Sequence, residues 1–280
     1  MSFGLTVLGS VNLDLIVQVR ELPQAGETVT GGQYTALPGG KGANVAVAAK
    51  RLGAETEIMA AVGNDDYAAQ ALVNLAAEGV YLDAVRRVDA HTGLAFITVS
   101  EDGENQIAVA SGANAAYAPA DVPKLCSDVL ITQFEIPVSV IESAIEGYAG
   151  FVTVNASPVR DDVDAILKRA DLVIVNKGEA AQYDLSDHAG LVAVTLGSKG
   201  AELRKAGKII ASATPPKVEV VDTTGAGDAF AAALTVALAE GQSEQAALEF
   251  ACAVGALTTT KLGTQTASPT RSEVDALLSR

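Results

Sequence analysis

Two glycine-rich segments of the sequence combine residues that can bind an anion with residues that can move a proton. The later segment, Asp222–Phe230, reads D-T-T-G-A-G-D-A-F and precedes an alanine-rich apolar run that predicts a helix. Gly225, Ala226 and Gly227 carry little or no side chain, so an anion can approach the N–H groups at the helix N-terminus. Asp228 would repel that anion unless it takes a proton from an incoming hydroxyl. A plain helix cap is the simpler alternative for this residue.

The earlier segment, Gly39–Asn44, reads G-G-K-G-A-N and also precedes an apolar helix pattern. Glycines on both sides of Lys41 suit either an anion or sugar hydroxyls that meet the backbone and the ammonium group. The segment is not a Walker loop, because the chain contains no G-x-x-x-x-G-K-[ST]. Taken alone, it indicates a binding turn at the start of a helix.

Apolar runs separated by helical patterns predict the strands that would position both segments. A β-branched run at 218–221 predicts one further strand, directly before the later glycine loop. The pattern indicates a single α/β domain over residues 1–280 with a mostly parallel sheet. Asn12 and Asp14 follow the first strand, as ligand-binding residues of such sheets do. The main strands are expected at Leu5–Leu8, Ile58–Val62, Leu130–Gln133, Phe151–Asn155, Leu172–Asn176, Val192–Leu196 and Ile209–Ala211.

Two excursions from this rhythm predict a small second sheet. One holds strands at Leu15–Val19 and Thr28–Tyr34, and the other holds strands at Phe96–Val99 and Gln106–Val109 with a hairpin turn at Asp102-Gly103. We therefore expect lid strands inserted at about 15–36 and 94–111, attached to the edge of the main sheet.

The second half of the chain holds a Gly/Ser-rich turn and an unusually short connection. Thr195–Gly200 reads T-L-G-S-K-G after a strand and could reach a phosphate, although a plain turn is the alternative. Between Asn176 and Val192 there is room for only one short helix, whereas a parallel crossover usually takes a dozen or more residues in addition to its loops. We expect that connection to be lean.

Composition excludes several classes of function. The 280 residues carry a net charge of −15, which argues against nucleic acids and anionic membranes as partners. Two cysteines and two histidines, widely spaced, match no zinc or disulfide framework. The N-terminus has no signal-peptide pattern, and no apolar run reaches membrane-spanning length. We expect a cytoplasmic protein.

Together, G-G-K-G-A-N and D-T-T-G-A-G-D-A-F resemble the two signatures of the ribokinase family of carbohydrate and nucleoside kinases. The resemblance covers nearly the whole chain and includes G-S-V-N-L-D near the N-terminus and E-N-Q-I-A-V-A-S-G-A-N-A after the hairpin. It implies a three-layer α/β/α sandwich with a β-sheet lid, often paired in a homodimer. It also implies transfer of the ATP γ-phosphoryl group to a primary sugar hydroxyl, with the 5-hydroxyl of D-ribose as the expected acceptor.

The resemblance further implies roles for individual residues. Asp228 would be the base, and Gly225, Ala226 and Gly227 would form the anion hole. The sugar would be bound by Asn12, Asp14, Gly40, Lys41, Gly42, Asn44, Glu135 and Asp228. ATP would lie along Asn176, Thr195, Leu196, Gly197, Ser198, Lys199, Gly200, Gly227 and Cys252.

Two cations are also implied by the resemblance. Mg²⁺ would be held by Asn176 and Glu179 through water, as suits an ion that keeps much of its hydration shell. An activating K⁺ would be held, in part by backbone carbonyls, at Asp222, Thr224, Thr258, Lys261, Gly263 and Ala267. Ala267 stands where family members often have a serine hydroxyl.

Two alternatives remain open at this point. The acceptor could be another small polyol, such as 2-deoxyribose, a fructose-type sugar or a nucleoside. The chain could instead be a non-catalytic sugar- or nucleotide-binding regulator on the same fold. Loss of the base or a broken glycine loop would mark such a regulator, and the sequence shows neither.

Overall fold

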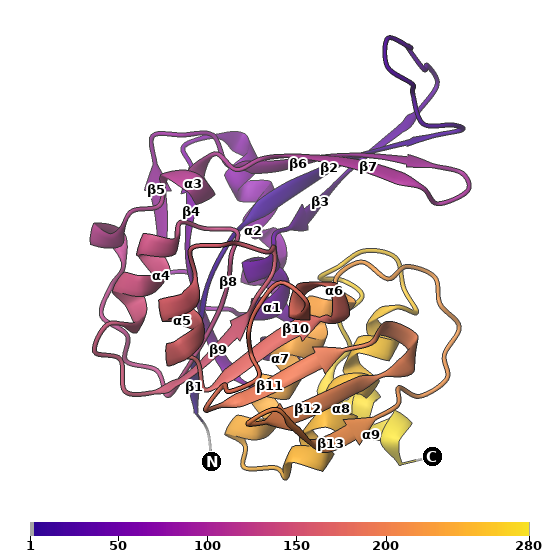
Figure 1. The fold of residues 1–280 in the computed structure, drawn as a ribbon. Helices are drawn as coiled ribbons and strands as arrows, with labels where there is room; N and C mark the ends of the chain where they lie inside the picture. Colours follow the sequence, from indigo (N-terminus) through magenta and orange to yellow (C-terminus); the bar gives the residue numbers. More distant parts are fainter. Residues whose placement is uncertain (1–2, 280) are drawn as a thin grey trace.

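The computed structural model describes residues 3–279, in which a nine-stranded sheet forms the centre of the molecule (Figure 1). The strand order is β13-β12-β11-β10-β9-β8-β1-β4-β5. The seven strands from β11 to β5 in this order are parallel, and β12 and β13 are antiparallel at one edge. Buried runs of Val, Ile and Leu form the parallel strands, as expected for a sheet covered on both faces. The strands are β1 (Gly4–Leu8), β4 (Glu55–Gly63), β5 (Val85–Val88), β8 (Val129–Gln133), β9 (Phe151–Asn155), β10 (Leu172–Asn176), β11 (Leu191–Thr195), β12 (Ala201–Lys205) and β13 (Lys208–Ala213).

Helices cover both faces of this sheet, so the predicted three-layer α/β/α sandwich is confirmed. One hydrophobic core lies under α1, α2, α7, α8 and α9, and a second lies under α4 and α5 on the opposite face. No helix of residues 3–279 is long and apolar enough to cross a membrane. The helices are α1 (Lys41–Arg51), α2 (Asp66–Ala77), α3 (Ala113–Ala116), α4 (Val138–Ile145), α5 (Asp164–Arg169), α6 (Lys177–Ala180), α7 (Ala226–Ala239), α8 (Glu244–Thr258) and α9 (Arg271–Leu278), with short 3₁₀ turns at Pro119–Asp121 and Gly197–Lys199.

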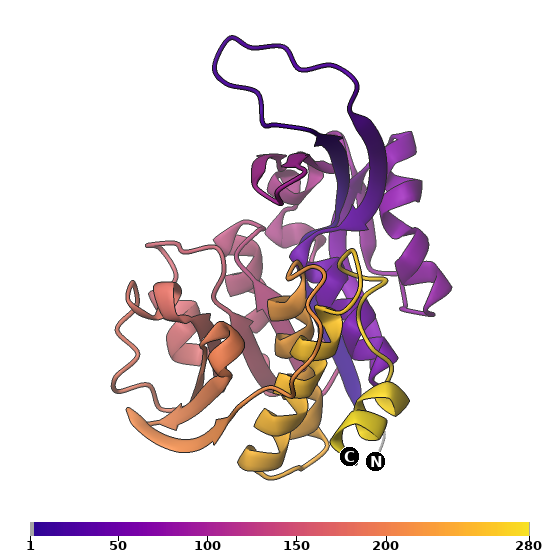
Figure 2. The same ribbon diagram turned by 90° about the vertical axis from the view of Figure 1, so that its right-hand side faces the viewer.

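A separate four-stranded sheet, called the small sheet below, projects from one end of the molecule (Figure 1). Its order is β3-β2-β6-β7, from β2 (Asn12–Val19), β3 (Gln33–Gly39), β6 (Gly93–Ser100) and β7 (Asn105–Ala110). The predicted hairpin turn joins β6 to β7, and Gly103 there has a φ of 88°. The loop between β2 and β3 extends furthest from the large sheet (Figure 2).

The predicted boundaries of the small sheet were partly wrong. Residues 28–32 form no strand, and β3 begins only at Gln33. The glycine pair explains the difference, because Gly31 has a φ of 86°, which a strand residue does not adopt. At its other end the small sheet begins earlier than expected, since Asn12 already pairs with Gly39 and Gly93. The inserted segments are therefore 12–39 and 93–110.

The strand predicted at 218–221 is also wrong. This segment has no regular secondary structure, and Val220 and Val221 are 60% and 61% exposed. Its backbone passes the C-terminal end of α8 instead of a sheet edge. The N–H groups of Val221 and Asp222 both donate to the carbonyl of Thr259, at 2.8 and 3.1 Å. Its β-branched residues thus occupy a loop, and no strand of residues 3–279 pairs with it.

The connection between β10 and β11 is short and contains one short helix, as predicted. It contains the one-turn helix α6 and a stretch at 181–190 without strand or further helix, yet β10 and β11 pair in parallel. Asn176 accepts hydrogen bonds from the N–H groups of Gly178 and Glu179, and Glu179 Oε2 accepts one from Asn176 N at 2.7 Å. This reciprocal cap stabilises a helix otherwise too short to persist.

Candidate active site

Because the strands are parallel, the predicted site residues lie together at the carboxyl ends of the strands of the large sheet. Thr195 and Asn176 end the neighbouring strands β11 and β10, and Asn155 ends β9. Glu135 follows β8 and Ser10 follows β1. At β1 the order in which the chain adds strands to the sheet changes direction, because β1 pairs in parallel with β4 on one side and with β8 on the other. Ligand crevices in open α/β sheets lie at such points.

The N-terminus of α7 forms an open, glycine-lined turn. Gly225 precedes the helix with a φ of 76°, a left-handed conformation that favours glycine. A Cβ atom placed on Gly227 would find no other atom within 4 Å. The space beside this first turn is therefore available to a ligand, and the positive end of the helix dipole faces it.

Asp228, in the first turn of α7, points across to neighbouring elements. Its side chain is 6% exposed and accepts a hydrogen bond from Asn44 Nδ2 on α1 at 2.9 Å. Asn155 Nδ2, at the end of β9, lies 3.5 Å from the second carboxylate oxygen. The residue that caps α7 is Gly225, which has no side chain to cap with. The helix-cap alternative for Asp228 is therefore wrong.

Burial and one lysine set the charge state of this carboxyl group. Burial raises the pKa of Asp228 above its ordinary value, while the Lys41 ammonium and the Asn44 hydrogen bond oppose that rise. In turn, the pKa of Lys41 is raised, chiefly by the negative charge of Asp228 and further by Glu135 and Glu179. Lys41 thus stays protonated beside a carboxyl group that holds a proton more readily than usual.

A buried serine that the sequence did not single out holds the start of α1. Ser10 Oγ donates to Glu135 Oε2 at 2.5 Å, and the same oxygen accepts from Lys41 N at 3.3 Å. Gly42 lies so close to the end of β1 that a Cβ there would collide with the backbone of Gly9. The glycine at 42 therefore has a packing role, and Glu135 is tied to the N-terminal turn of α1. The G-S pair after β1 was the only signal for Ser10.

Asn12 and Asp14 lie on one face of β2, as their spacing predicted. Asp14 lies against Gly39, and burial, with a contribution from Glu135, raises its pKa to about 7. Asn12 is 5% exposed, and its Oδ1 accepts from Asn114 Nδ2 at 2.7 Å. Asn114 was not predicted to have a role, although it lies in the segment E-N-Q-I-A-V-A-S-G-A-N-A after the hairpin.

The predicted nucleotide-binding turn lies beside Asn176. Leu196 N donates to Gly200 O at 2.7 Å, which closes the turn around Gly197–Lys199 after β11.

Cys252, on α8, is buried, and its Sγ lies 3.8 Å from the carbonyl oxygen of Ala213 at the end of β13. Burial raises the pKa of this thiol to about 11, so the side chain is neutral.

The loops predicted to hold K⁺ are joined by Asp222. Its Oδ1 accepts from Thr224 N at 2.9 Å, and its Oδ2 accepts from Gly263 N at 3.1 Å. The Thr258 hydroxyl is used within α8, where it donates to Val254 O at 2.9 Å. Ala267 is fully buried and offers no side-chain ligand.

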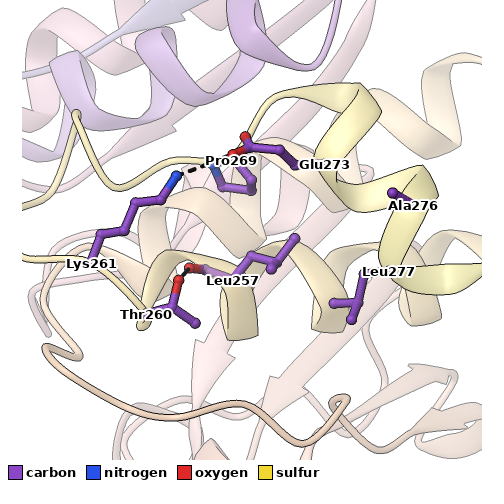
Figure 3. A pocket seen from close by; sticks show the side chains of 7 residues that line it. All are labelled: Leu257, Thr260, Lys261, Pro269, Glu273, Ala276 and Leu277. Atoms are coloured by element: carbon purple, nitrogen blue, oxygen red, sulfur yellow. Dashed lines mark hydrogen bonds and ion pairs between the residues drawn. The ribbon is translucent and has the colours of Figure 1, made fainter. Parts of the chain in front are cut away.

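The Lys261 side chain is engaged in an ion pair with a residue of α9. It pairs with Glu273 at 3.1 Å across a pocket of about 260 Å³ between α8 and α9 (Figure 3). None of the predicted sugar or nucleotide residues lines this pocket. Its lining residues are Leu257, Thr260, Lys261, Pro269, Glu273, Ala276 and Leu277.

Comparison with known proteins gives the same assignment along the whole chain. Residues 3–271 match the family described as pfkB family carbohydrate kinase. Ribokinase from Bacillus subtilis is 37% identical over 99% of both chains, and ribokinase from Haemophilus influenzae is 35% identical over 96% of both. The crystal structure of a ribokinase from Thermotoga maritima superposes with a TM-score of 0.91 at 31% identity, covering 99% of this chain and 100% of that one.

An Arabidopsis thaliana ribokinase solved with ribose and ATP superposes with a TM-score of 0.84 at 32% identity over the full length of both chains. The family match and these relatives span nearly the whole sequence, so both glycine-rich segments lie within the matched region. This chain therefore belongs to the pfkB family of carbohydrate kinases.

Proposed function

We propose that this protein transfers the γ-phosphoryl group of ATP to the 5-hydroxyl of D-ribose. The observation that carries the proposal is the position of Asp228, a buried carboxyl group held by Asn44 beside the open turn Gly225–Gly227. The resemblance to ribokinases, one of them solved with ribose and ATP, supports ribose as the acceptor.

The sugar would lie between the start of α1 and the small sheet, where the polar groups are dense. Asn12, Asp14 and Glu135 would accept hydrogen bonds from the sugar hydroxyl groups or donate hydrogen bonds to them. Lys41 would add an ammonium donor. The buried Oδ1 atom of Asn44 has no hydrogen-bond partner in residues 3–279, which supports its use by a ligand hydroxyl. A polyol needs such a set, because each buried polar group left unpaired costs about 1–3 kcal/mol. Gly40 and Gly42, which let the start of α1 pack against the chain that follows β1, would place this turn beside the sugar.

ATP would approach from the β10–β11 side of the sheet. Its phosphates would run from the turn at Thr195–Gly200 past Asn176 to the N-terminus of α7. At that point the N–H groups of Gly225, Ala226 and Gly227 would stabilise the charge that builds on the transferred group. Cys252 would face the adenine of ATP as a neutral thiol. The adjacent positions of Thr195 and Asn176 on paired strands support this path.

Asp228 would act as the general base. As the acceptor oxygen attacks the γ-phosphorus, its O–H bond breaks and the proton passes to the Asp228 carboxylate, while the bond between the γ-phosphorus and the bridging oxygen breaks and ADP leaves. A carboxyl group with a raised pKa suits this step, because it holds the proton better than an ordinary aspartate.

Two cations fit the residues present. Mg²⁺ would lie beside Asn176 and Glu179, held mostly by water and phosphate oxygens, as suits an ion that keeps much of its hydration shell. Bound there, Mg²⁺ would neutralise phosphate charge. K⁺ would lie by the Asp222 carboxylate, which already bridges Thr224 and Gly263, with further ligands from backbone carbonyls.

We further propose a homodimer through the small sheet and a cytoplasmic location. Ile107, Val109 and Phe96 are 58%, 56% and 48% exposed on this sheet, and β3 and β7 are its free edges. Apolar side chains beside free edges favour pairing with a second copy. The cytoplasm supplies ATP, and Cys126 and Cys252 are free thiols, as is usual in a reducing compartment.

A coupled assay of ADP formation tests the proposed activity. The purified protein is given Mg²⁺ and ATP with D-ribose, 2-deoxyribose, fructose or adenosine, each with and without K⁺. We expect the highest kcat/KM with ribose and a higher rate with K⁺. A higher kcat/KM with another acceptor would reassign the substrate within the same chemistry. Absence of turnover with every acceptor would overturn the kinase proposal and favour the non-catalytic binder.

A further inference from the structure

Four chain crossings connect the large sheet to the small sheet, and one buried asparagine, Asn114, touches two of them. Asn114 is 2% exposed and lies in α3, directly after β7 returns from the small sheet. Its Oδ1 accepts from Val11 N at 2.9 Å, and its Nδ2 donates to Val11 O at 3.1 Å. The amide therefore pairs with Val11 as a neighbouring strand would.

The same amide nitrogen also binds a residue of the sugar site. Asn114 Nδ2 donates to Asn12 Oδ1 at 2.7 Å. Because the acceptor oxygen of Asn12 is used in this bond, the orientation of the Asn12 amide is determined, and its Nδ2 is the group left for a ligand. An amide without such a partner could present either its oxygen or its nitrogen.

The surrounding chain is built to permit this contact. A Cβ on Gly93 would collide with both Asn12 Oδ1 and Asn114 Nδ2, so the first residue of β6 leaves room for the two amides. Gly112, with a φ of 49°, lies against His91, and Ala113 N donates to His91 O at 2.7 Å. The start of α3 is thereby held against the crossing that leads to β6.

We infer that Asn114 is a positioning residue for the sugar site, which sets the Asn12 amide with its N–H₂ group toward the acceptor sugar. The inference rests on the proposed function, since it needs Asn12 to bind the acceptor. Asn114 itself does not touch the sugar. Its effect passes through Asn12, so it should alter sugar binding and leave nucleotide binding unchanged.

A double-mutant cycle on Asn12 and Asn114 tests the inference. KM values for ATP and for whichever acceptor the wild type uses best are measured for wild type, Asn12→Ala, Asn114→Ala and the double variant. We expect Asn114→Ala to raise the sugar KM about tenfold, as loss of one well-placed hydrogen bond does, with less than about a twofold change in the ATP KM. In the Asn12→Ala background the same change should alter the sugar KM less than about twofold.

A purely structural role for Asn114 predicts a different result. The bonds to Val11 exist with or without the Asn12 side chain, so their loss would act equally in both backgrounds. Equal increases in the two backgrounds, or an unchanged sugar KM in Asn114→Ala, would therefore overturn the inference. Asn74→Ala, on α2, is the matched control and should leave both KM values unchanged.

Two further variants cover a failure of Asn114→Ala to fold. Asn114→Asp keeps an acceptor for Val11 N but places a carboxylate oxygen opposite Asn12 Oδ1, and Gly93→Ala forces the two amides apart. Both should raise the sugar KM at an unchanged ATP KM, and an unchanged sugar KM in both would contradict the inference.

A wild-type protein inactive with every acceptor would remove the proposed function and the inference together, whereas an active wild type with an additive cycle would remove the inference alone.

Discussion

Asn44 and Asp228 are 184 residues apart in the chain, yet Asn44 Nδ2 donates a 2.9 Å hydrogen bond to Asp228 Oδ2. This contact joins the two glycine-rich segments of the sequence, because α1 begins in one and α7 begins in the other. Helix α1, which would bind the sugar, thus also holds the Asp228 carboxyl group that would take the proton from the sugar hydroxyl. Any change that separates α1 from α7 should affect binding and turnover together.

Asp228→Asn should abolish most of the turnover while preserving the fold. The variant is isosteric but cannot take a proton from the acceptor hydroxyl, so we expect kcat to fall about 10²- to 10⁴-fold. Sugar affinity, measured by calorimetry, should change little. Asp164→Asn provides the control, since Asp164 is an exposed residue in the first turn of α5. A kcat equal to that of wild type would exclude Asp228 as the base.

Gly227→Ala probes the proposed anion hole without disturbing packing. A Cβ at this position meets no atom within 4 Å, and alanine is favoured over glycine inside a helix by about 0.5–1 kcal/mol. We expect the free energy of unfolding to be equal or higher, and kcat/KM for ATP to fall at least about tenfold because the methyl group keeps the phosphate from the backbone. Gly4→Ala in β1, where a Cβ makes ordinary contacts, should change neither quantity. Full activity in Gly227→Ala would place the phosphate elsewhere.

Lys41→Met should move the acid limb of the pH–rate profile to higher pH. Lys41 lowers the pKa of Asp228, so its removal lets burial raise that pKa further. The base is then protonated, and inactive, at pH values where the wild type still works. The position of the limb in kcat/KM is the quantity to compare, because sugar binding will also weaken. Lys41→Arg retains the charge and should leave the limb in place, whereas a shift to lower pH in Lys41→Met would contradict the assignment.

Asp14→Asn should stabilise the protein at neutral pH and weaken sugar binding. The folded-state pKa of Asp14 is about 7 against an ordinary 3.8, so the folded protein binds more protons than the unfolded chain between these values. The contribution of Asp14 to the free energy of unfolding therefore falls as pH rises through this window. Above pH 7 the variant should be more stable by about 1–3 kcal/mol, less than the ~4 kcal/mol that the full shift implies, because Asp14 keeps some solvent contact.

Urea unfolding of wild type and Asp14→Asn at pH 4 and pH 8 measures this effect. The stability difference should be largest at pH 8 and should shrink toward pH 4. The exposed residue Asp187 provides the same substitution without burial, and Asp187→Asn should leave stability nearly unchanged at both pH values. A less stable Asp14→Asn at pH 8 would show that the carboxylate makes compensating contacts.

The proposed homodimer predicts a mass near twice the 28.4 kDa of one chain in light scattering at micromolar concentration. Ile107→Asp should shift that mass toward the monomer, because it places a charge on an apolar surface of the small sheet. Ile209→Asp is matched in residue type and exposure, at 54% against 58%, but lies on β13 at the far edge of the large sheet. It should remain dimeric. A wild-type mass of one chain would contradict the dimer.

The elements that depend on short-range pattern could be read directly from the sequence. The apolar runs of the parallel strands, the Asp102-Gly103 hairpin and the lean connection after Asn176 are all present in the structure. Their signals lie in neighbouring residues, namely side-chain periodicity, turn chemistry and loop length. The glycine-rich segments likewise showed which residue types could bind an anion or move a proton.

Features that depend on strand order could not be read in this way. The 218–221 segment has the composition of a strand, but no strand in the described part of the chain pairs with it, and it passes the end of α8 instead. The contacts of Asp228 with Asn44, and of Asn114 with Asn12, require the sheet to bring distant strand ends together. Burial, which raises the pKa of Asp14 to about 7, is likewise a property of the assembled structure. Sequence patterns thus named the reactive groups, and long-range packing determined which of them meet and in which protonation state.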